Sequence, residues 1–232
     1  HLLSWAIWLP ILAGIIVALI GSNGARANIA RWVALIGAIA SFLVTLPLFS
    51  GFDRLNGGMQ FTELASWIPA LGLNYHLGVD GISVLLVILN AFTTVLVVLA
   101  GWQVIQKKPA QYFAAFLIMS GLINGAFSAL DAILFYAFFE GMLIPMYLII
   151  GVWGGPRRVY ASIKFFLYTL LGSLLMLVAL VYLSRLAGGS FEILDMQAIP
   201  AIAKNVQILV FIAFFLSFAV KVPMWPVHTW LP

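Results

Sequence analysis

Two charged residues lie inside long apolar stretches of the sequence, and they are the strongest candidates for chemistry. Glu140 lies within residues 132–153, a run long enough to cross a lipid bilayer, and Lys221 lies near the end of the last apolar run. A charged side chain at membrane depth costs several kcal/mol, so it usually has a partner and a function. One acid and one base on different membrane spans indicate proton transfer more than packing.

Glu140 is the candidate for taking up and releasing the proton. If its helix begins near Ala132, Glu140 lies about 12 Å along the axis, far from either surface of a ~30 Å hydrocarbon core. Burial and a neighbouring cation shift the pKa of a carboxyl in opposite directions, so a carboxyl held between them can exchange protons. The alternative is a protonated structural glutamate that bonds to a neighbouring helix.

Lys221 is the natural partner of Glu140. Counted from Asn205, it lies about 24 Å along its helix and closer to the membrane surface than Glu140, so the alternative is a lysine that snorkels to the interface. Pro223 and Pro226 follow it and should break the helix. Broken helices at membrane depth line cavities or ion sites. The spacing does not require a direct salt bridge, and a water-mediated pair fits as well.

Four further polar residues are weaker candidates for a functional role. Lys164 is either a snorkelling lysine or a relay between Lys221 and the cytoplasm or a neighbouring subunit. His228, just past Pro226, is either structural or a proton relay, because histidine titrates near neutral pH. Asp131 precedes one expected helix and Asp80 opens another, and capping of those helices is their best interpretation.

The composition places the chain in a membrane. Of its 232 residues, 64% are hydrophobic and 8% are charged, whereas soluble proteins carry roughly 25% charged residues. The formal net charge of +4 comes from scattered basic residues, which does not favour nucleic-acid binding. The chain has no cysteine, so it offers neither disulfides nor thiolate ligands for an iron–sulfur cluster.

The apolar runs predict an all-α, polytopic membrane protein with about seven transmembrane helices. A span needs about 20 apolar residues, and such runs are too long for barrel strands. We expect the first run to be a mature span and not a signal peptide, because it has no basic leader and no small-residue cleavage site. The seventh helix should break at Pro223 and Pro226. The predicted spans are residues 2–20, 29–49, 79–101, 112–130, 132–153, 159–183 and 205–222.

The lysine and arginine residues predict the orientation of the spans. One set of helix ends carries seven of them and the other carries three, namely Arg54, Arg185 and Lys204. The richer set should be cytoplasmic. The N-terminus is then external, as are the loops at residues 50–78 and 187–204.

Four segments resemble the chain M family of antiporter-like membrane subunits of respiratory complex I, the proton-pumping NADH:quinone oxidoreductase. Residues 139–154 look like the helix-5 signature of that family, and residues 143–147 (Leu-Ile-Pro-Met-Tyr) favour chain M over its paralogues. Residues 164–169 resemble the helix-6 signature. Residues 75–83 and 218–232 are similar to the opening of its third helix and to its broken seventh helix.

The resemblance implies a fold and a set of site residues. Such subunits have about fourteen helices, including two inverted repeats that each contain a broken helix. Residues 1–110 would form helices 1–3 with the external loop 50–78, and residues 111–232 an incomplete first repeat. Glu140 and Lys221 then match the pair thought to drive proton transfer. Lys164 and His228 match a helix-6 lysine and a histidine on the second half of helix 7.

The resemblance also implies partners and a location. Flavin (FMN), iron–sulfur clusters and quinone belong to other subunits, and this chain itself performs no redox chemistry. The antiporter-like chains L and N and the lipid bilayer are its expected neighbours, in a bacterial inner membrane. We therefore expect a translocase subunit that couples quinone reduction elsewhere to proton transfer. The alternatives are a subunit of a multi-subunit Na⁺/H⁺ antiporter or membrane-bound hydrogenase, or a passive scaffold in the membrane arm.

Overall fold

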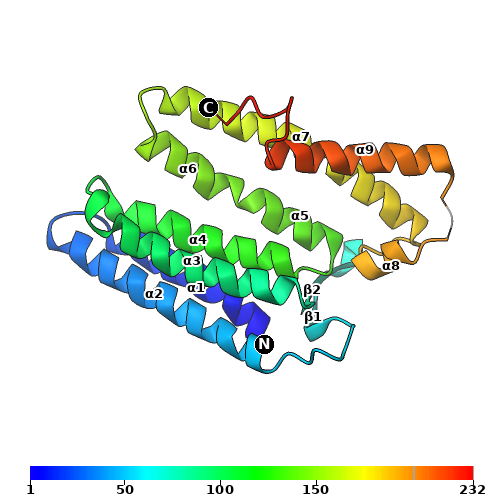
Figure 1. Cartoon of the computed structure of the whole chain (residues 1–232), viewed down its shortest axis with the longest axis horizontal. Helices are drawn as coiled ribbons and strands as arrows, with labels where there is room; N and C mark the ends of the chain where they lie inside the picture. The colour runs from blue at the N-terminus through cyan, green and yellow to red at the C-terminus, as the bar shows by residue number, and fades with distance from the viewer. Residues whose placement is uncertain (201, 232) are drawn as a thin grey trace. The chain divides into compact units, whose positions relative to one another are not determined.

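The computed structural model describes residues 1–200 and 202–231, and these form two compact units (Figure 1). The first unit comprises residues 1–65 and 75–129, and the second comprises residues 66–74 and 130–232 apart from the two undescribed positions. Among the described residues, seven helical segments are long and apolar enough to cross a membrane. This confirms the prediction of a multi-pass α-helical membrane protein.

The first unit is built on four long helices. Helix α1 packs against α2 and α4, α2 also packs against α3, and α3 packs against α4. The four helices are α1 (Leu2–Ile20), α2 (Ala25–Ser50), α3 (Ser83–Val104) and α4 (Pro109–Ser128). Proline suits the start of α4, because the first helical position needs no amide donor.

Small residues allow the helices of the first unit to approach closely. A Cβ at Gly121 would lie 2.4 Å from the backbone oxygen of Ile7, and one at Gly37 would lie 2.6 Å from the Cβ of Ala13. Interfaces between membrane helices are rich in small residues for this reason. Gly121 and Gly125 form a Gly-x-x-x-Gly pattern, which is common where membrane helices pack closely.

A two-stranded hairpin interrupts the loop at residues 50–78. Strands β1 (Gln60–Ile68) and β2 (Leu73–Val79) pair with each other, and a short 3₁₀ turn η1 (Pro69–Leu71) joins them. The sequence interpretation did not anticipate this hairpin. Glu63 is the single buried residue of β1, so the strand lacks the alternation of buried and exposed residues by which a strand is recognised.

The second unit is organised around one long helix, α7. Helices α5, α6, α8 and α9 all contact α7, and Figure 1 shows α9 alongside it. The five helices are α5 (Ala132–Gly141), α6 (Leu143–Trp153), α7 (Arg158–Leu186), α8 (Ile193–Gln197) and α9 (Lys204–Lys221). The predicted fifth span at residues 132–153 is thus one apolar run that contains two helices.

Asp131 is the N-cap of α5, as the sequence predicts, whereas the N-cap position of α3 is Ile82 and Asp80 binds the start of α3 from the turn before it. The carboxylate of Asp131 accepts hydrogen bonds from the amides of Ile133 and Leu134, both at 2.9 Å. The carboxylate of Asp80 accepts one from the amide of Ser83 at 2.7 Å, and this bond lowers the pKa of Asp80. Burial raises the pKa of Asp131 instead, because removal from water penalises the charged form.

Candidate functional site

Glu140 lies at a break in a membrane span. Helix α5 ends at Gly141 and α6 begins at Leu143, with Met142 as a turn between them. Pro145 explains the break, since it lacks an amide donor for the carbonyl of Gly141 and its ring crowds that carbonyl. Glu140 is therefore held two residues before the kink at Met142, on a backbone whose regular hydrogen bonding is interrupted.

The carboxylate of Glu140 is buried without a hydrogen bond. Its side chain is 14% exposed, and neither carboxylate oxygen has a hydrogen-bond partner among the described residues. Ser173 of α7 faces this carboxyl, but the hydroxyl of Ser173 donates to the backbone oxygen of Leu170 at 2.9 Å. Buried acceptors are normally satisfied, so a buried carboxylate without a hydrogen bond is unusual.

Lys221 is the last residue of α9, and its side chain points at the carboxylate of Glu140. Its Nζ lies 3.8 Å from Oε1 of Glu140, and its side chain is 15% exposed. The nearest hydrogen-bond acceptor is the backbone oxygen of Phe139, at 3.2 Å. The ammonium also lies over the ring of Phe139, 4.0 Å from the ring centroid, in a cation–π contact. Lys221 is therefore held mainly by Phe139 and paired loosely with Glu140.

Helix α9 ends at Lys221 because of the prolines that follow. Pro223 has no amide to donate, and the chain turns so that the amide of Met224 bonds to the backbone oxygen of Ala219 at 2.9 Å. The indole of Trp230 then donates to the backbone oxygen of Val220 at 2.7 Å. The break at Pro223 was predicted from the sequence, and the segment after it folds back onto the end of α9, with turns and no helix over residues 222–231.

Lys164 belongs to a second polar contact in the same unit. Its ammonium donates to the backbone oxygen of Thr229, next to His228. Trp230 packs against Phe165, with ring centroids 5.1 Å apart. The Nδ1 atom of His228 is buried without a hydrogen-bond partner among the described residues. Lys164 therefore reaches the segment that carries His228, and does not simply extend to a membrane surface.

The structure brings the four predicted site residues together in two pairs. Glu140 meets Lys221, and Lys164 meets the backbone beside His228. Lys164 and Lys221 are both ammonium cations without an acceptor, so neither a hydrogen bond nor an ion pair can join them directly. Glu140 and Lys221 were predicted to lie at different depths along their helices. Their side chains are nevertheless only 3.8 Å apart.

Phe139 and Ser173 were not identified from the sequence. Phe139 supplies both the carbonyl and the ring that hold Lys221, and its position beside Glu140 was the only available signal. Ser173 is fully buried in the middle of an apolar span. A polar residue at such a position is a recognisable signal, since polar side chains in membranes usually face other helices or a cavity.

Solved structures define the class of this fold. The chain resembles a chain of respiratory complex I from Thermus thermophilus, with a TM-score of 0.85 and 34% identity over 99% of this chain and 46% of that one. It also superposes on a chain of the Mrp complex from a Dietzia species, with a TM-score of 0.85 but 15% identity, over 100% of this chain and 25% of that one. The second likeness concerns the fold alone. The fold is that of the antiporter-like membrane subunits.

The family follows from the sequence comparisons. Residues 6–127 match the family described as NADH-ubiquinone oxidoreductase chain 4, amino terminus, and residues 129–232 match NADH:quinone oxidoreductase/Mrp antiporter. The chain belongs to this family of complex I membrane subunits. It is 49% identical to NADH-quinone oxidoreductase subunit M of Rhodobacter capsulatus, over 100% of this chain and 47% of the relative. It is 42% identical to NADH-ubiquinone oxidoreductase chain 4 of Arabidopsis thaliana, over 99% and 46%. The chain thus spans about half the length of these relatives.

Proposed function

We propose that this chain is part of a proton-translocating membrane subunit of NADH:quinone oxidoreductase, in which Glu140 and Lys221 form the proton-transfer pair. The observation that carries the proposal is the loose pairing of these two residues, 3.8 Å apart at a kink in one helix and the end of another. Membership of the complex I family supports the reaction class.

In this mechanism the pair works as an electrostatic switch. While the ammonium of Lys221 lies near Glu140, it stabilises the carboxylate and is itself stabilised. When a neighbouring charge draws the two apart, Lys221 loses that partner and its proton is more easily released. No direct hydrogen bond between them has to be broken, because Lys221 donates to the backbone of Phe139 instead. Moving the ammonium of Lys221 away from Glu140 therefore requires only a small rearrangement.

Lys164 and His228 would carry the proton onward from Lys221. Lys164 already contacts the backbone of Thr229, and Nδ1 of His228 is buried with an open hydrogen-bonding position among the described residues. A water molecule beside His228 could bridge the gap between the two pairs, since a bridging water can replace a direct hydrogen bond. In this proposal His228 and Lys164 relay the proton, and Glu140 and Lys221 control its release.

The wider setting is part of the same proposal. The subunit would lie in a bacterial inner membrane with its N-terminus outside, beside the antiporter-like chains L and N. FMN, iron–sulfur clusters and quinone would be held by other subunits, and quinone reduction there would drive proton transfer here. Residues 1–110 would form the first three helices with their external loop, and residues 111–232 the incomplete first repeat.

The test uses the assembled, full-length complex. Glu140→Gln removes the ionisable group at nearly constant volume, so proton pumping should fall roughly tenfold, because a positioned acid–base group contributes at least that much to proton transfer. Quinone reduction by uncoupled membranes serves as the check on assembly. Asp195→Asn is the matched control, since Asp195 is an exposed carboxylate outside the spans. Normal coupled pumping in Glu140→Gln would refute the proposed role.

A subunit of a Na⁺/H⁺ antiporter is the second candidate, because one matching family model also covers Mrp antiporters. The two candidates differ in their partners. A complex I subunit should co-purify with a peripheral arm that carries flavin and iron–sulfur clusters, whereas an antiporter subunit should co-purify with membrane subunits alone. A passive scaffold is distinguished by the Glu140→Gln measurement.

A further inference from the structure

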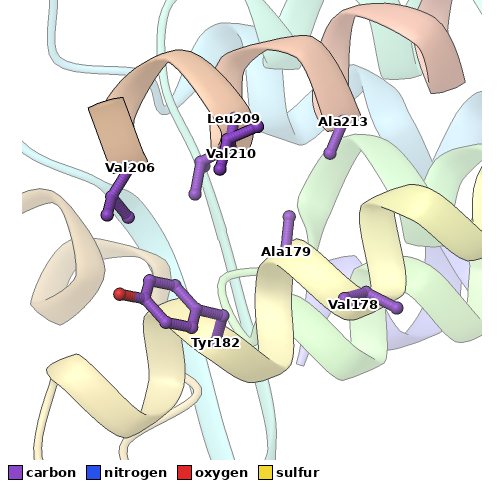
Figure 2. Close-up of a pocket in the computed structure, with 7 residues that line it drawn as sticks. All are labelled: Val178, Ala179, Tyr182, Val206, Leu209, Val210 and Ala213. Atoms are coloured by element: carbon purple, nitrogen blue, oxygen red, sulfur yellow. The ribbon is translucent and has the colours of Figure 1, made fainter. Parts of the chain in front are cut away.

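Four polar side chains form one cluster in the first unit, between α1, α3 and α4. Asn90 and Thr94 belong to α3, whereas Ser120 and Asn124 belong to α4, and all but Asn90 are buried. The groove between α7 and α9 of the second unit differs from this cluster, since Figure 2 shows aliphatic side chains and Tyr182 along it. Buried polar groups within candidate membrane spans are costly unless they are hydrogen-bonded, so the bonds of the cluster indicate what it does.

The hydrogen bonds of the cluster run from α3 through α4 to α1. The side-chain amide of Asn90 donates to the backbone oxygen of Ser120 at 2.9 Å and to Oδ1 of Asn124 at 2.7 Å. The side-chain amide of Asn124 donates in turn to the backbone oxygen of Ala6 at 2.9 Å. Backbone oxygens only accept hydrogen bonds, so the nitrogens of both asparagine side chains must face them. Asn124 is therefore an acceptor toward α3 and a donor toward α1.

Pro10 explains why the backbone oxygen of Ala6 needs a donor from another helix. Pro10 lies inside α1, four residues after Ala6. In a regular helix the amide of the tenth residue would donate to the carbonyl of the sixth, but proline has no amide hydrogen. A backbone carbonyl left unpaired in lipid is costly, because no water is available to bond to it. Asn124 supplies the missing hydrogen bond from α4.

Gly121 lets α4 approach α1 closely enough for this contact. A Cβ at Gly121 would lie 2.4 Å from the backbone oxygen of Ile7, the residue after Ala6. Gly121 and Asn124 are three residues apart and therefore lie on the same face of α4. The glycine that permits the close approach and the asparagine that uses it thus face the same turn of α1.

Thr94 and Ser120 complete the cluster. The hydroxyl of Thr94 lies 2.8 Å from the backbone oxygen of Asn90 and 2.8 Å from the hydroxyl of Ser120. The side-chain amide of Asn90 also donates to the hydroxyl of Ser120, at 3.2 Å. These contacts join α3 to α4 and hold Asn90 in the orientation in which it donates to Asn124. They do not involve α1, so Thr94 offers a control for the contact with Ala6.

We propose that Asn124 is a positioning residue that replaces the hydrogen bond lost at Pro10, so that α1 reaches its full stability in the membrane only when α4 docks on it. Without α4, the backbone oxygen of Ala6 would be left without its donor in lipid. Docking of α4 removes that cost, and it does so at one register, because only one side chain supplies the donor. The inference concerns the first unit and is independent of proton transfer at Glu140.

The experiment is a double-mutant cycle in the full-length protein, unfolded reversibly by sodium dodecyl sulfate in mixed micelles. Asn124→Leu has a similar volume but no donor, so it should raise the equilibrium constant for unfolding about tenfold. Pro10→Ala restores the missing amide of α1. In the Pro10→Ala background, Asn124→Leu should therefore raise the constant only about threefold, for the bond lost to Asn90. If Asn124→Leu alone does not fold, adding Pro10→Ala should recover folded protein.

Thr94→Val is the matched control, because Thr94 belongs to the same cluster but its hydroxyl bonds to Asn90 and Ser120. Its effect on unfolding should be the same with and without Pro10→Ala. An effect of Asn124→Leu that is equal in both backgrounds, or no recovery of folded protein by Pro10→Ala, would overturn the proposal. A Thr94→Val effect that shrinks equally in the Pro10→Ala background would also overturn it, since the change would then reflect general repacking.

Discussion

Oε1 of Glu140 and Nζ of Lys221 lie 3.8 Å apart, and yet neither oxygen of Glu140 accepts a hydrogen bond among the described residues. The two charges are close enough to stabilise each other, but a large desolvation cost opposes that attraction in a buried site. A fully hydrogen-bonded buried pair would be held firmly in one arrangement. The loose pairing suits a switch, because a modest external charge can shift its balance.

Apart from the attraction of Glu140, contacts with Phe139 should contribute most to holding the ammonium of Lys221 in place. Phe139→Leu keeps the backbone oxygen but removes the ring under the ammonium, and should cost about 0.5–2 kcal/mol of stability. Thermal unfolding in detergent measures the effect. In a Lys221→Met background the same substitution should cost clearly less, because the cation is already absent. Equal costs in both backgrounds would attribute the effect to packing alone.

The close helix packing of the first unit should not tolerate a methyl group at Gly121. Its Cβ would lie 2.4 Å from the backbone oxygen of Ile7, so α1 and α4 must move apart. We expect Gly121→Ala to lower the free energy of unfolding by about 1–3 kcal/mol. Gly155→Ala is the control, because a Cβ there meets no atom within 4 Å. Thermal unfolding that is equal for the two variants would contradict the packing described for Gly121.

The indole of Trp230 should hold the segment after the broken helix in place. Trp230→Phe keeps a ring against Phe165 but removes the donor to the backbone oxygen of Val220. We expect faster amide hydrogen exchange in residues 222–231, by roughly a factor of 5, for the loss of one hydrogen bond of about 1 kcal/mol. Exchange in α5 should be unchanged. Unaltered exchange in residues 222–231 would show that other contacts hold the segment.

Asp131 should give the stability of the second unit a pH dependence. Burial raises the pKa of Asp131 in the folded protein above its ordinary value of 3.8, and the nearby carboxylate of Glu192 raises it further. The folded state therefore binds a proton more readily than the unfolded state. The contribution of Asp131 is then fully present below about pH 3.8 and is lost as the pH rises through the folded pKa.

Asp131→Asn tests this dependence, because asparagine can still accept the hydrogen bonds of the cap. As the pH rises from about 4 to about 7, the unfolding temperature of the Asp131→Asn variant should rise relative to that of the unsubstituted protein. Asp53→Asn, in an exposed loop of the first unit, should show no such trend. A constant difference across this pH range would mean that Asp131 keeps its ordinary pKa.

The sequence predicted the membrane spans well and the site geometry only in part. Long apolar runs define spans because every backbone group in lipid must be paired within a helix. The cap at Asp131 and the hydrogen bond that Asp80 accepts at the start of α3 follow from local residue types. The kink at Met142 could also have been inferred from the sequence. Pro145 lies within the apolar run of residues 132–153, and a proline breaks a helix there just as Pro223 does after Lys221.

The contact between Glu140 and Lys221 could not be derived from depth along the helices. Rise per residue fixes the position of a residue along its own axis, but the tilt of each helix and the reach of a lysine side chain decide the final distance. The hairpin at β1 and β2 was missed for another reason. Most of β1 is exposed or only half-buried, so hydrophobic burial leaves no periodic pattern in its sequence.

The most direct test of the account is a double-mutant cycle on proton transport in the full-length, assembled complex. Glu140→Gln, Lys221→Met and the double variant are compared with Lys204→Met, which removes an exposed lysine from the other end of α9. If Glu140 and Lys221 act as one unit, each single variant should lose most of the transport, and the double variant should lose hardly more than either. Losses that multiply in the double variant, or transport equal to that of Lys204→Met, would contradict a shared proton-transfer site.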